Sequence, residues 1–580
     1  MRRRSNLANR IQEQNHADIS RAPRSRARGI LTVLAIAVGI GWPALAQQTA
    51  ITGVVKNASG EPVSGALVRV RSEGLGLGFL VVSHAQGRYT TPNLLAGKYT
   101  VEGFGGNFQS AAPGPVEVRN GQAGNVDVIL SVPLQIPPRE KRLTDEDYRK
   151  ILPDSDVRAK RLITTWCAYC HTLQEVVSAR MTREEWQQTF DRMRDQLYEN
   201  RKRPLELGSF TQQQEGEAMV DYLAKHLGPD APVDPRVAGQ SLPRRGGALH
   251  PNRNWPGSLL QGAGAKYVMF EYALPSGSTP RDIAVDSQGI AWVSERSTGM
   301  LGRFDPRSLS YTRIAPPAGK GSKWQLNAVA VDAEDQVWYV DDGPNARLLR
   351  YDPKGGEFQS YPLPEYRYAV APGASGARMT ALRFWDGSIW GTGTTANRIV
   401  RLDPKTGKAT KYPVPKGSEP YGLAIGGDKM IWYSAQFGNA IVKLDPGTGR
   451  LTQYKAPTPH SDLRGMAADG EGNLWAAGTE SNKLIKMDYR SGERTEYSVP
   501  TEGSGPFALD VDAKRKVIWF SEIYADKMGR FDPASNSFVE FWHSSSDAGV
   551  RRIEVDRSNP DRVWWASASS DKIGYIQVLE

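Results

Sequence analysis

A tryptophan recurs seven times in the C-terminal half of the chain, at intervals of 42 to 52 residues. Each follows an apolar segment that ends near an acidic turn, as in Ile283 to Asp286. Repeats of roughly 40–50 residues with four short strands are typical of β-propeller blades. We therefore predict a seven-bladed β-propeller over residues 266–580, with one of these tryptophans in each blade: Trp292, Trp338, Trp390, Trp432, Trp475, Trp519 and Trp564.

The two ends of this region indicate how the ring closes. The seventh repeat stops after three strands, the last of which contains Ile573–Ile576. One extra strand-like segment, Phe270–Pro275, precedes the first repeat. If these two segments pair, the ring is closed and no sheet edge is left open.

The N-terminus is typical of a secretory signal peptide. Residues 1–28 carry eight arginines, and an apolar run follows from Ile30 to Ala46, ending in the tripeptide Ala-Leu-Ala. This order predicts cleavage after Ala46 and export to the periplasm or the extracellular space. The run is short for a membrane span, so an uncleaved anchor is the alternative, and we expect no stable span after cleavage.

Charge and cysteine content narrow the function classes. The formal net charge is +10 at pH 7, and loss of the predicted signal peptide, with its eight arginines and two acidic residues, leaves about +4. An excess this small on a chain of this length argues against nucleic acid as a partner. The chain has only two cysteines, three positions apart, so we expect them to serve a purpose other than structural disulfides.

Residues 50–131 are predicted to form a small antiparallel β-sandwich. Apolar and polar residues alternate there in short runs that turn sequences separate. The segment resembles the carboxypeptidase regulatory-like domain, a transthyretin-like accessory module that is usually structural or adhesive, and we expect no chemistry in it. The resemblance rests on Gly53, Gly60, Pro62-Val63, Gly65-Ala66-Leu67-Val68, Gly87-x-Tyr89 and Leu95-Ala96-Gly97-Lys98-Tyr99.

Residues 145–227 change to a helical pattern. Thr182 to Glu185 form a capping-box sequence, which predicts that a helix begins there, and Thr211 can cap a second helix. A compact all-helical unit is expected, followed by a linker rich in Pro and Gly over residues 228–265. The two helices have the predicted buried faces Trp186, Phe190, Met193 and Leu197, and Met219, Tyr222, Leu223 and Leu227.

Both cysteines lie in this helical unit, in the sequence Cys167-Ala168-Tyr169-Cys170-His171. Cys-x-x-Cys-His is the attachment motif of c-type haem. A zinc site needs about four ligands and so a second cysteine pair, which the sequence lacks, whereas a redox-active Cys-x-x-Cys is expected in an α/β domain. We therefore predict one covalently bound haem c, attached at Cys167 and Cys170, with His171 as the proximal iron ligand.

With this motif, the helical unit resembles a class I cytochrome c domain. One variant of that family has a Glu-Glu-Trp helix with a downstream Met and a closing helix with a Tyr-Leu pair, which match Glu184-Glu185-Trp186, Met193 and Tyr222-Leu223. The resemblance implies Met193 as the distal ligand, and a core position is the other interpretation of that side chain. A Met ligand would raise the reduction potential relative to a second His. The further candidates for the distal ligand are Met181, Met219 and His226.

The propeller region resembles the streptogramin (virginiamycin B) lyase propeller over about residues 267–580, as in Trp519-Phe520-Ser521-Glu522. The resemblance implies seven blades, a central histidine as base, and carboxylates that hold Mg²⁺. Loss of such a base lowers a rate by roughly 10²–10⁴-fold, which disfavours lyase activity here. None of the seven equivalent positions is histidine: they are Arg281, Asn327, Thr380, Tyr421, Arg464, Phe507 and Arg551.

Two ligand types remain open for the expected channel. Glu295, Glu522 and Asp341 are candidates for a divalent-cation site, and hydrogen bonds at the blade edges are the favoured alternative. The three arginines among the innermost positions favour an anionic guest, such as a carboxylate or sulfate, with facing salt bridges as the alternative.

The sequence as a whole favours an exported electron-transfer protein or a haem-dependent oxidoreductase. In this hypothesis the propeller binds a small-molecule substrate or a periplasmic redox partner, and the cytochrome-like unit carries one electron at a time. The alternatives are a divergent carbon–oxygen lyase with an appended cytochrome and a non-catalytic binding scaffold. No catalytic residue is assigned.

Overall fold

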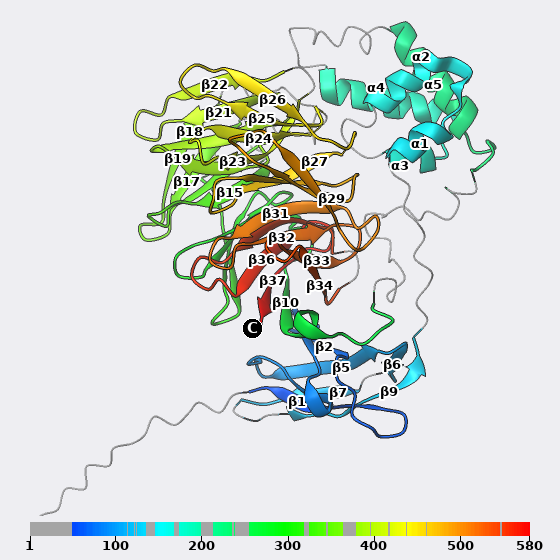
Figure 1. The fold of residues 1–580 in the computed structure, drawn as a ribbon, viewed down its shortest axis with the longest axis vertical. Helices are drawn as coiled ribbons and strands as arrows, with labels where there is room; N and C mark the ends of the chain where they lie inside the picture. The colour runs from blue at the N-terminus through cyan, green and yellow to red at the C-terminus, as the bar shows by residue number, and fades with distance from the viewer. Residues whose placement is uncertain are drawn as a thin grey trace, which may run out of the picture. The chain divides into compact units, whose positions relative to one another are not determined.

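The computed structural model describes most of the chain after residue 48 (Figure 1). No helix within this described part combines the length and the apolar content that a bilayer crossing requires. The predicted signal peptide lies outside it. The described residues are 49–134, 145–166, 173–198, 213–234, 237 and 255–579, with short gaps at 113, 121, 123, 318–323, 344–345, 364–378, 395, 416–417, 437, 460 and 546–547.

Residues 51–133 form an N-terminal β-sheet domain. Its strands run in the order β3-β2-β5-β6-β9-β1-β4, with β7 beside β5 and β8 beside β1. The prediction of a purely antiparallel domain is wrong, because β1 pairs parallel with β8 and β9. In β1 every second side chain is buried at first, as the alternating sequence predicts. The strands are β1 (Ile51–Asn57), β2 (Leu67–Ser72), β3 (Leu77–Val82), β4 (Arg88–Thr90), β5 (Gly97–Gly105), β6 (Phe108–Ser110), β7 (Pro115–Val118), β8 (Gly124–Asn125) and β9 (Val128–Pro133).

The described part of the predicted helical unit consists of five α-helices with short connections and one 3-10 turn (Asp154–Asp156). The capping box is confirmed: Glu185 N–H donates to Thr182 Oγ1 at 3.3 Å, and Thr182 N–H donates to a Glu185 carboxylate oxygen at 2.9 Å. Trp186 and Phe190 pack with Met219, Tyr222, Leu223 and Leu227 in a separate apolar core, as predicted. The helices are α1 (Asp145–Ile151), α2 (Val157–Trp166), α3 (Leu173–Ser178), α4 (Arg183–Tyr198) and α5 (Gln213–Leu227).

The propeller contains six separate four-stranded antiparallel sheets, each formed by four consecutive strands. The first three blades are β11 (Pro280–Val285), β12 (Ala291–Glu295), β13 (Leu301–Asp305), β14 (Ser310–Ile314); β15 (Leu326–Val331), β16 (Val337–Asp341), β17 (Arg347–Asp352), β18 (Glu357–Pro362); and β19 (Leu382–Trp385), β20 (Ser388–Gly393), β21 (Arg398–Leu402), β22 (Ala409–Pro413). The next three are β23 (Pro420–Ile425), β24 (Ile431–Ala435), β25 (Ala440–Leu444), β26 (Leu451–Lys455); β27 (Leu463–Ala468), β28 (Leu474–Gly478), β29 (Lys483–Met487), β30 (Arg494–Ser498); and β31 (Pro506–Asp512), β32 (Val517–Glu522), β33 (Lys527–Asp532), β34 (Ser537–Trp542).

The seventh predicted blade is present as strands but is not a separate sheet. Strands β35 (Val550–Val555), β36 (Arg562–Ser567) and β37 (Lys572–Val578) pair in order, and β37 pairs antiparallel with β10 (Tyr267–Ala273). This confirms the predicted pairing of the two chain ends. Strand β35 contacts both β31 and β11, so these strands complete the ring between the sixth and first blades.

The outer edge of β10 is not open, because it pairs with β3 of the N-terminal domain. The strands therefore form one thirteen-stranded sheet, which the sequence did not predict. Gly78 of β3 makes room for Glu271 of β10, since a Cβ at Gly78 would lie 2.6 Å from Glu271 Cγ. The end of the predicted linker also packs on this domain: the Trp255 ring stacks on Phe104 with centroids 4.4 Å apart.

A hydrogen bond explains the acidic turn that accompanies five of the seven tryptophans. In the first blade the buried Trp292 indole N–H donates to Asp286 at 2.9 Å, and the same carboxylate accepts from two amides of the turn. Five blades repeat this indole–carboxylate bond, which satisfies a polar group that would otherwise be buried without a partner. The other four pairs are Trp338–Asp332, Trp432–Asp428, Trp475–Asp469 and Trp564–Asp556.

Candidate functional site

The predicted haem attachment residues, Cys167, Cys170 and His171, lie outside the described residues. The flanking elements are described: α2 ends at Trp166, directly before the motif, and α3 begins at Leu173, just after it. In the sequence, the motif stands between two helices of a unit that has its own apolar core. Because the motif is outside the described residues, its role in haem attachment stays a prediction.

The four candidates for the distal ligand differ in their surroundings. Met193 lies in α4, and its side chain is outside the described part. Met219 is 1% exposed and packed in the core. The half-buried Met181 has its sulfur 3.8 Å from the Thr189 hydroxyl. Contacts are thus known for Met181 and Met219, and the choice of Met193 as distal ligand stays a prediction.

His226 is engaged within the helical unit. Its Nε2 lies 2.6 Å from Ser155 Oγ, and its ring lies 4.6 Å from that of Tyr222. Burial, followed by the positive charge of Lys225, lowers the pKa of His226. One of the two imidazole nitrogens that could ligate a metal is therefore already in a hydrogen bond.

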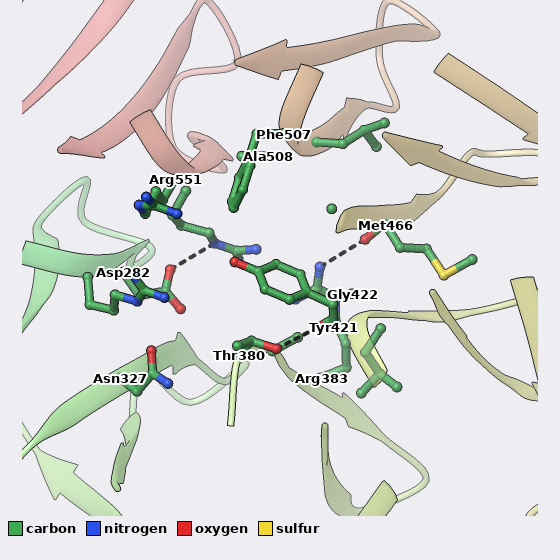
Figure 2. A pocket seen from close by; sticks show the side chains of 16 residues that line it. Asp282, Asn327, Thr380, Arg383, Tyr421, Gly422, Met466, Phe507, Ala508 and Arg551 are labelled. Atoms are coloured by element: carbon green, nitrogen blue, oxygen red, sulfur yellow. Dashed lines mark hydrogen bonds and ion pairs between the residues drawn. The ribbon is translucent and has the colours of Figure 1, made fainter. Parts of the chain in front are cut away.

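The innermost strands of the propeller surround a pocket (Figure 2). Its volume is about 510 Å³ with the open mouth included. The wall combines arginines and one carboxylate with aromatic and aliphatic side chains. The lining residues are Arg281, Asp282, Asn327, Thr380, Ala381, Arg383, Tyr421, Gly422, Leu423, Gly465, Met466, Phe507, Ala508, Leu509, Arg551 and Arg552.

Six of the seven positions singled out in the sequence line this pocket, and Arg464 is the exception. The Arg464 guanidinium lies 4.9 Å from the ring centroid of Tyr421 and 5.2 Å from that of Phe507, and pairs with Asp462 at 2.9 Å. Glu419 is buried near this pair, and burial raises its pKa well above the usual range. At this end of the pocket, the wall is therefore aromatic, and behind it lies Arg464, whose charge Asp462 balances.

Sequence reasoning missed a second set of charged residues, which lie further along the same strands. On each innermost strand one residue pairs with the repeat tryptophan, and in four blades that residue is alanine, as in Ala284. In the other three it is Arg383, Asp510 or Glu554. An alignment of the repeats on their tryptophans would have revealed these exceptions.

Of these three residues, Glu554 takes part in an ion-pair cluster, which Arg552 extends to Asp282. Arg552 lies 2.9 Å from Asp282 and 3.3 Å from Glu554. The second Asp282 oxygen accepts from Val329 N–H at 3.0 Å. Burial raises the pKa of both Asp282 and Glu554, and Arg552 opposes the rise. The innermost strand of the first blade, β11, is thereby joined to the neighbouring strand β35.

Arg383 has a different environment. Its guanidinium donates to the carbonyl oxygens of Leu382, at 2.8 Å, and Met466, at 3.4 Å. Figure 2 shows the second bond, which crosses from the third blade to the fifth. Burial and the nearby Arg552 lower the pKa of Arg383 to about 10, so the group is still charged at neutral pH. Within the described part of the chain, no carboxylate oxygen lies within 4 Å of it.

Two of the three candidate cation ligands, Glu295 and Asp341, are held by contacts within their own blades. Glu295 accepts from the Tyr311 hydroxyl at 2.7 Å and pairs with Arg313 at 2.8 Å. Asp341 accepts from two backbone amides and pairs with Arg347 at 3.3 Å. Among the described residues, no three His, Cys, Asp or Glu side chains are arranged to hold a metal ion. These contacts favour the hydrogen-bonding interpretation.

Known proteins resemble two parts of the chain. The virginiamycin B lyase family model matches residues 366–580, and the carboxypeptidase regulatory-like domain matches residues 50–131. No curated protein matches the chain. Among solved structures, virginiamycin B lyase from Staphylococcus aureus is 26% identical, with 54% of this chain and 100% of that one covered and a TM-score of 0.47.

Two further solved structures give similar values. A streptogramin B lyase is 24% identical over 55% of this chain and 100% of its own, with a TM-score of 0.48. A catalytically inactive S. aureus virginiamycin B lyase with quinupristin is 26% identical over 54% and 100%, with a TM-score of 0.48. By the two family matches, the chain combines a virginiamycin B lyase-like β-propeller with an N-terminal carboxypeptidase regulatory-like domain.

Proposed function

We propose that this protein is an exported c-type haem protein that transfers electrons, acting as an oxidoreductase or as its electron relay in the periplasm or outside the cell. One observation carries the proposal: the only two cysteines of the chain stand in a Cys-x-x-Cys-His motif between two helices of a compact helical unit. The propeller would serve as the module that binds a substrate or a redox partner.

The donor set fits a covalently bound haem. Cys167 and Cys170 would form the two thioethers, His171 would ligate the iron on one side, and Met193 is the proposed ligand on the other. Bound haem would supply one-electron oxidation and reduction. The residues around it would exclude water, since Leu173, Trp186 and Tyr222 are buried beside the two ends of the motif or in the same core.

The propeller pocket does not favour the lyase alternative. Such chemistry needs a base in the channel, and Asp282, the carboxylate that lines the described pocket, is bound to Arg552 and to two backbone amides. The tyrosine at this wall, Tyr421, stands where the resemblance implies a histidine. A binding role for the propeller agrees better with these side chains than proton abstraction does.

Expression of the full chain in a host that matures c-type cytochromes tests the proposal. We expect a coloured, exported protein whose haem stays attached after denaturation, with an absorption spectrum that changes on reduction. Cys167→Ser combined with Cys170→Ser should abolish covalent haem, whereas Ser178→Ala, at the end of α3, should not. A colourless wild-type protein with both thiols free would refute the proposal.

The distal ligand is tested in the same preparation. Met193→Ala should remove the Met-to-iron charge-transfer band and lower the reduction potential. Met181→Ala is the matched control and should leave the band intact. A band that survives Met193→Ala and disappears in Met181→Ala would assign the ligand to Met181.

A further inference from the structure

Asp342 is a buried carboxyl group, 0% exposed, that connects three consecutive blades. It follows β16 of the second blade directly. Its Oδ2 accepts from the side-chain nitrogen of Asn327, in the innermost strand of the same blade, at 2.6 Å. Its Oδ1 accepts at 3.1 Å from the backbone N–H of Met379, which precedes β19 of the third blade. Arg296, directly after β12 of the first blade, lies 3.7 Å from Oδ2.

Asn327 carries this contact to the propeller pocket. Its side chain lines the pocket, and Figure 2 shows it on the wall between Asp282 and Thr380. The backbone carbonyl of Asn327 accepts from the Ser294 hydroxyl of the first blade, so the strand itself is held in place. The side-chain amide has one donor end and one acceptor end. Because the nitrogen donates to Asp342, the amide oxygen is the end that a ligand in the pocket meets.

The protonation state of Asp342 decides which way this amide faces. A carboxylate ion can only accept hydrogen bonds, so the groups that face it must be donors. In the protonated acid, one oxygen becomes a donor. That oxygen is Oδ2, because the backbone N–H of Met379, which faces Oδ1, cannot accept a hydrogen bond. The Asn327 amide can accept one if it turns its oxygen toward Asp342, and the turn presents its nitrogen to the pocket.

Opposing effects act on the charge of Asp342. Burial favours the neutral acid, whereas Arg296 and the two hydrogen bonds favour the carboxylate, and the neighbouring Asp341 disfavours it. Asp341 itself accepts from two backbone N–H groups and pairs with Arg347 at 3.3 Å. Burial is the largest of these effects and raises the pKa of Asp342 to about 6. Both forms of the carboxyl group are therefore accessible close to neutral pH.

We propose that Asp342 is a positioning residue for the propeller pocket: its carboxylate holds the Asn327 amide with the oxygen toward the pocket, and its protonation reverses the amide. At neutral pH the pocket then offers a hydrogen-bond acceptor at this point, which suits a ligand with an N–H or O–H group. In acid it offers a donor instead. The proposal goes beyond the proposed function and does not depend on haem, since its residues all belong to the propeller.

NMR spectroscopy of the full mature chain, labelled with nitrogen-15 in its asparagine side chains, tests the orientation. The Asn327 amide is identified as the signal that Asn327→Ser lacks. We expect its shifts to change with pH, with a midpoint near pH 6. In Asp342→Asn, which imitates the protonated acid, the signal should stay at its low-pH position at every pH. A signal that does not titrate in the wild type, or that titrates equally in Asp342→Asn, would overturn the proposal.

Two further variants separate this role from a general loss of stability. Asp386→Asn is the control, because Asp386 is 69% exposed on the surface of the third blade, and it should leave the titration unchanged. Asp341→Asn removes a charge that disfavours the Asp342 carboxylate, so the midpoint should move to lower pH. If Asp342→Asn fails to fold, the wild type and Asp341→Asn still decide. A midpoint that Asp341→Asn leaves in place would exclude Asp342 as the titrating group.

Phenol and anisole test the ligand class in the same spectra, since only phenol has an O–H group. Their rings suit the aromatic wall of Tyr421 and Phe507. At neutral pH we expect phenol to shift the Asn327 amide signal at a severalfold lower concentration than anisole, and this preference should disappear in Asp342→Asn. Equal shifts by both compounds at neutral pH, or no shift by either, would show that the pocket offers no acceptor at this point.

Discussion

Glu271 offers the sharpest test of how the propeller is closed. Its carboxylate is 4% exposed and accepts from Ser544 at 2.5 Å, from Ser545 at 2.7 Å and from Lys572 at 3.0 Å, and Arg71 of the N-terminal domain lies 3.9 Å away. Burial alone would raise the pKa of Glu271. The two cations and the hydroxyl bonds outweigh it and lower the pKa from 4.5 to about 2. The carboxylate is thus stabilised in its charged form only when the strands are paired.

The contribution of Glu271 to folding stability follows from this pKa. A shift of about 2.5 units corresponds to about 3 kcal/mol of folding stability at neutral pH. The folded-state pKa is the lower one, so this stability is present above pH 4.5 and is lost as the pH falls toward 2, with about 2 kcal/mol of it gone between pH 6 and pH 3. Replacing one partner of a buried ion pair costs about 3–5 kcal/mol, which agrees.

Glu271→Gln should therefore lower the free energy of unfolding by about 3 kcal/mol at pH 6, but by only about 1 kcal/mol at pH 3. Urea unfolding followed by tryptophan fluorescence measures both values. His543 is buried beside this cluster, and burial lowers its pKa to about 4, so it too destabilises the fold as the pH falls from 6.5 to 4. The Glu271 charge raises the pKa of His543, so the difference between the two proteins at pH 3 includes this coupling, whereas at pH 6, where folded His543 is neutral, the difference reports on Glu271.

Glu117→Gln provides the control, because Glu117 is 58% exposed and paired only with an exposed arginine on the surface of the N-terminal domain. We expect its effect to stay below about 0.5 kcal/mol. A loss of less than about 1 kcal/mol in Glu271→Gln at pH 6, or an equal loss at both pH values, would refute the reasoning.

Two further predictions concern packing in the blades. Gly574→Ala should destabilise the protein by about 1–3 kcal/mol, since its Cβ would lie 2.0 Å from Phe270 O, whereas Gly470→Ala, with open space around it, should change urea unfolding little. Trp292→Phe should lower the free energy of unfolding by about 1–2 kcal/mol more than Trp390→Phe does. Of these two tryptophans, only Trp292 donates its indole N–H to a described carboxylate. Equal losses of stability in thermal or urea unfolding would contradict this.

Much of the fold could be predicted because its elements repeat locally. Each blade carries a tryptophan and an acidic turn a few residues apart, and in five repeats a short-range hydrogen bond links them, as with Trp292 and Asp286. The Thr182–Glu185 capping box is equally local. The closing pair β10–β37 joins distant residues, and counting strands still predicted it, because one repeat lacked a strand and the other end had one in excess.

Counting the strands of the repeats could not predict the pairing of β3 with β10. All six residues of β3 are buried, a pattern that indicates a strand covered on both faces but does not identify its neighbours. The edge of β10 can pair with β3 only because β10 is the outermost strand beside β37. Its identity depends on Gly78 making room for Glu271, a contact between residues 193 positions apart in the sequence that no periodicity encodes.

Arg383 illustrates the same limit at the candidate site. A lone arginine in an apolar segment can point into a channel, into a neighbouring blade or to solvent, and only the register with Trp390 places it among the residues that face the channel. Its neighbours come from the ring: Asp282 belongs to the first blade and Arg552 to the strands that complete the circle. The ion pair between those two exists only while the ends of the chain are joined. The charges that surround Arg383 therefore depend on closure of the propeller, and weakening the closure must change them.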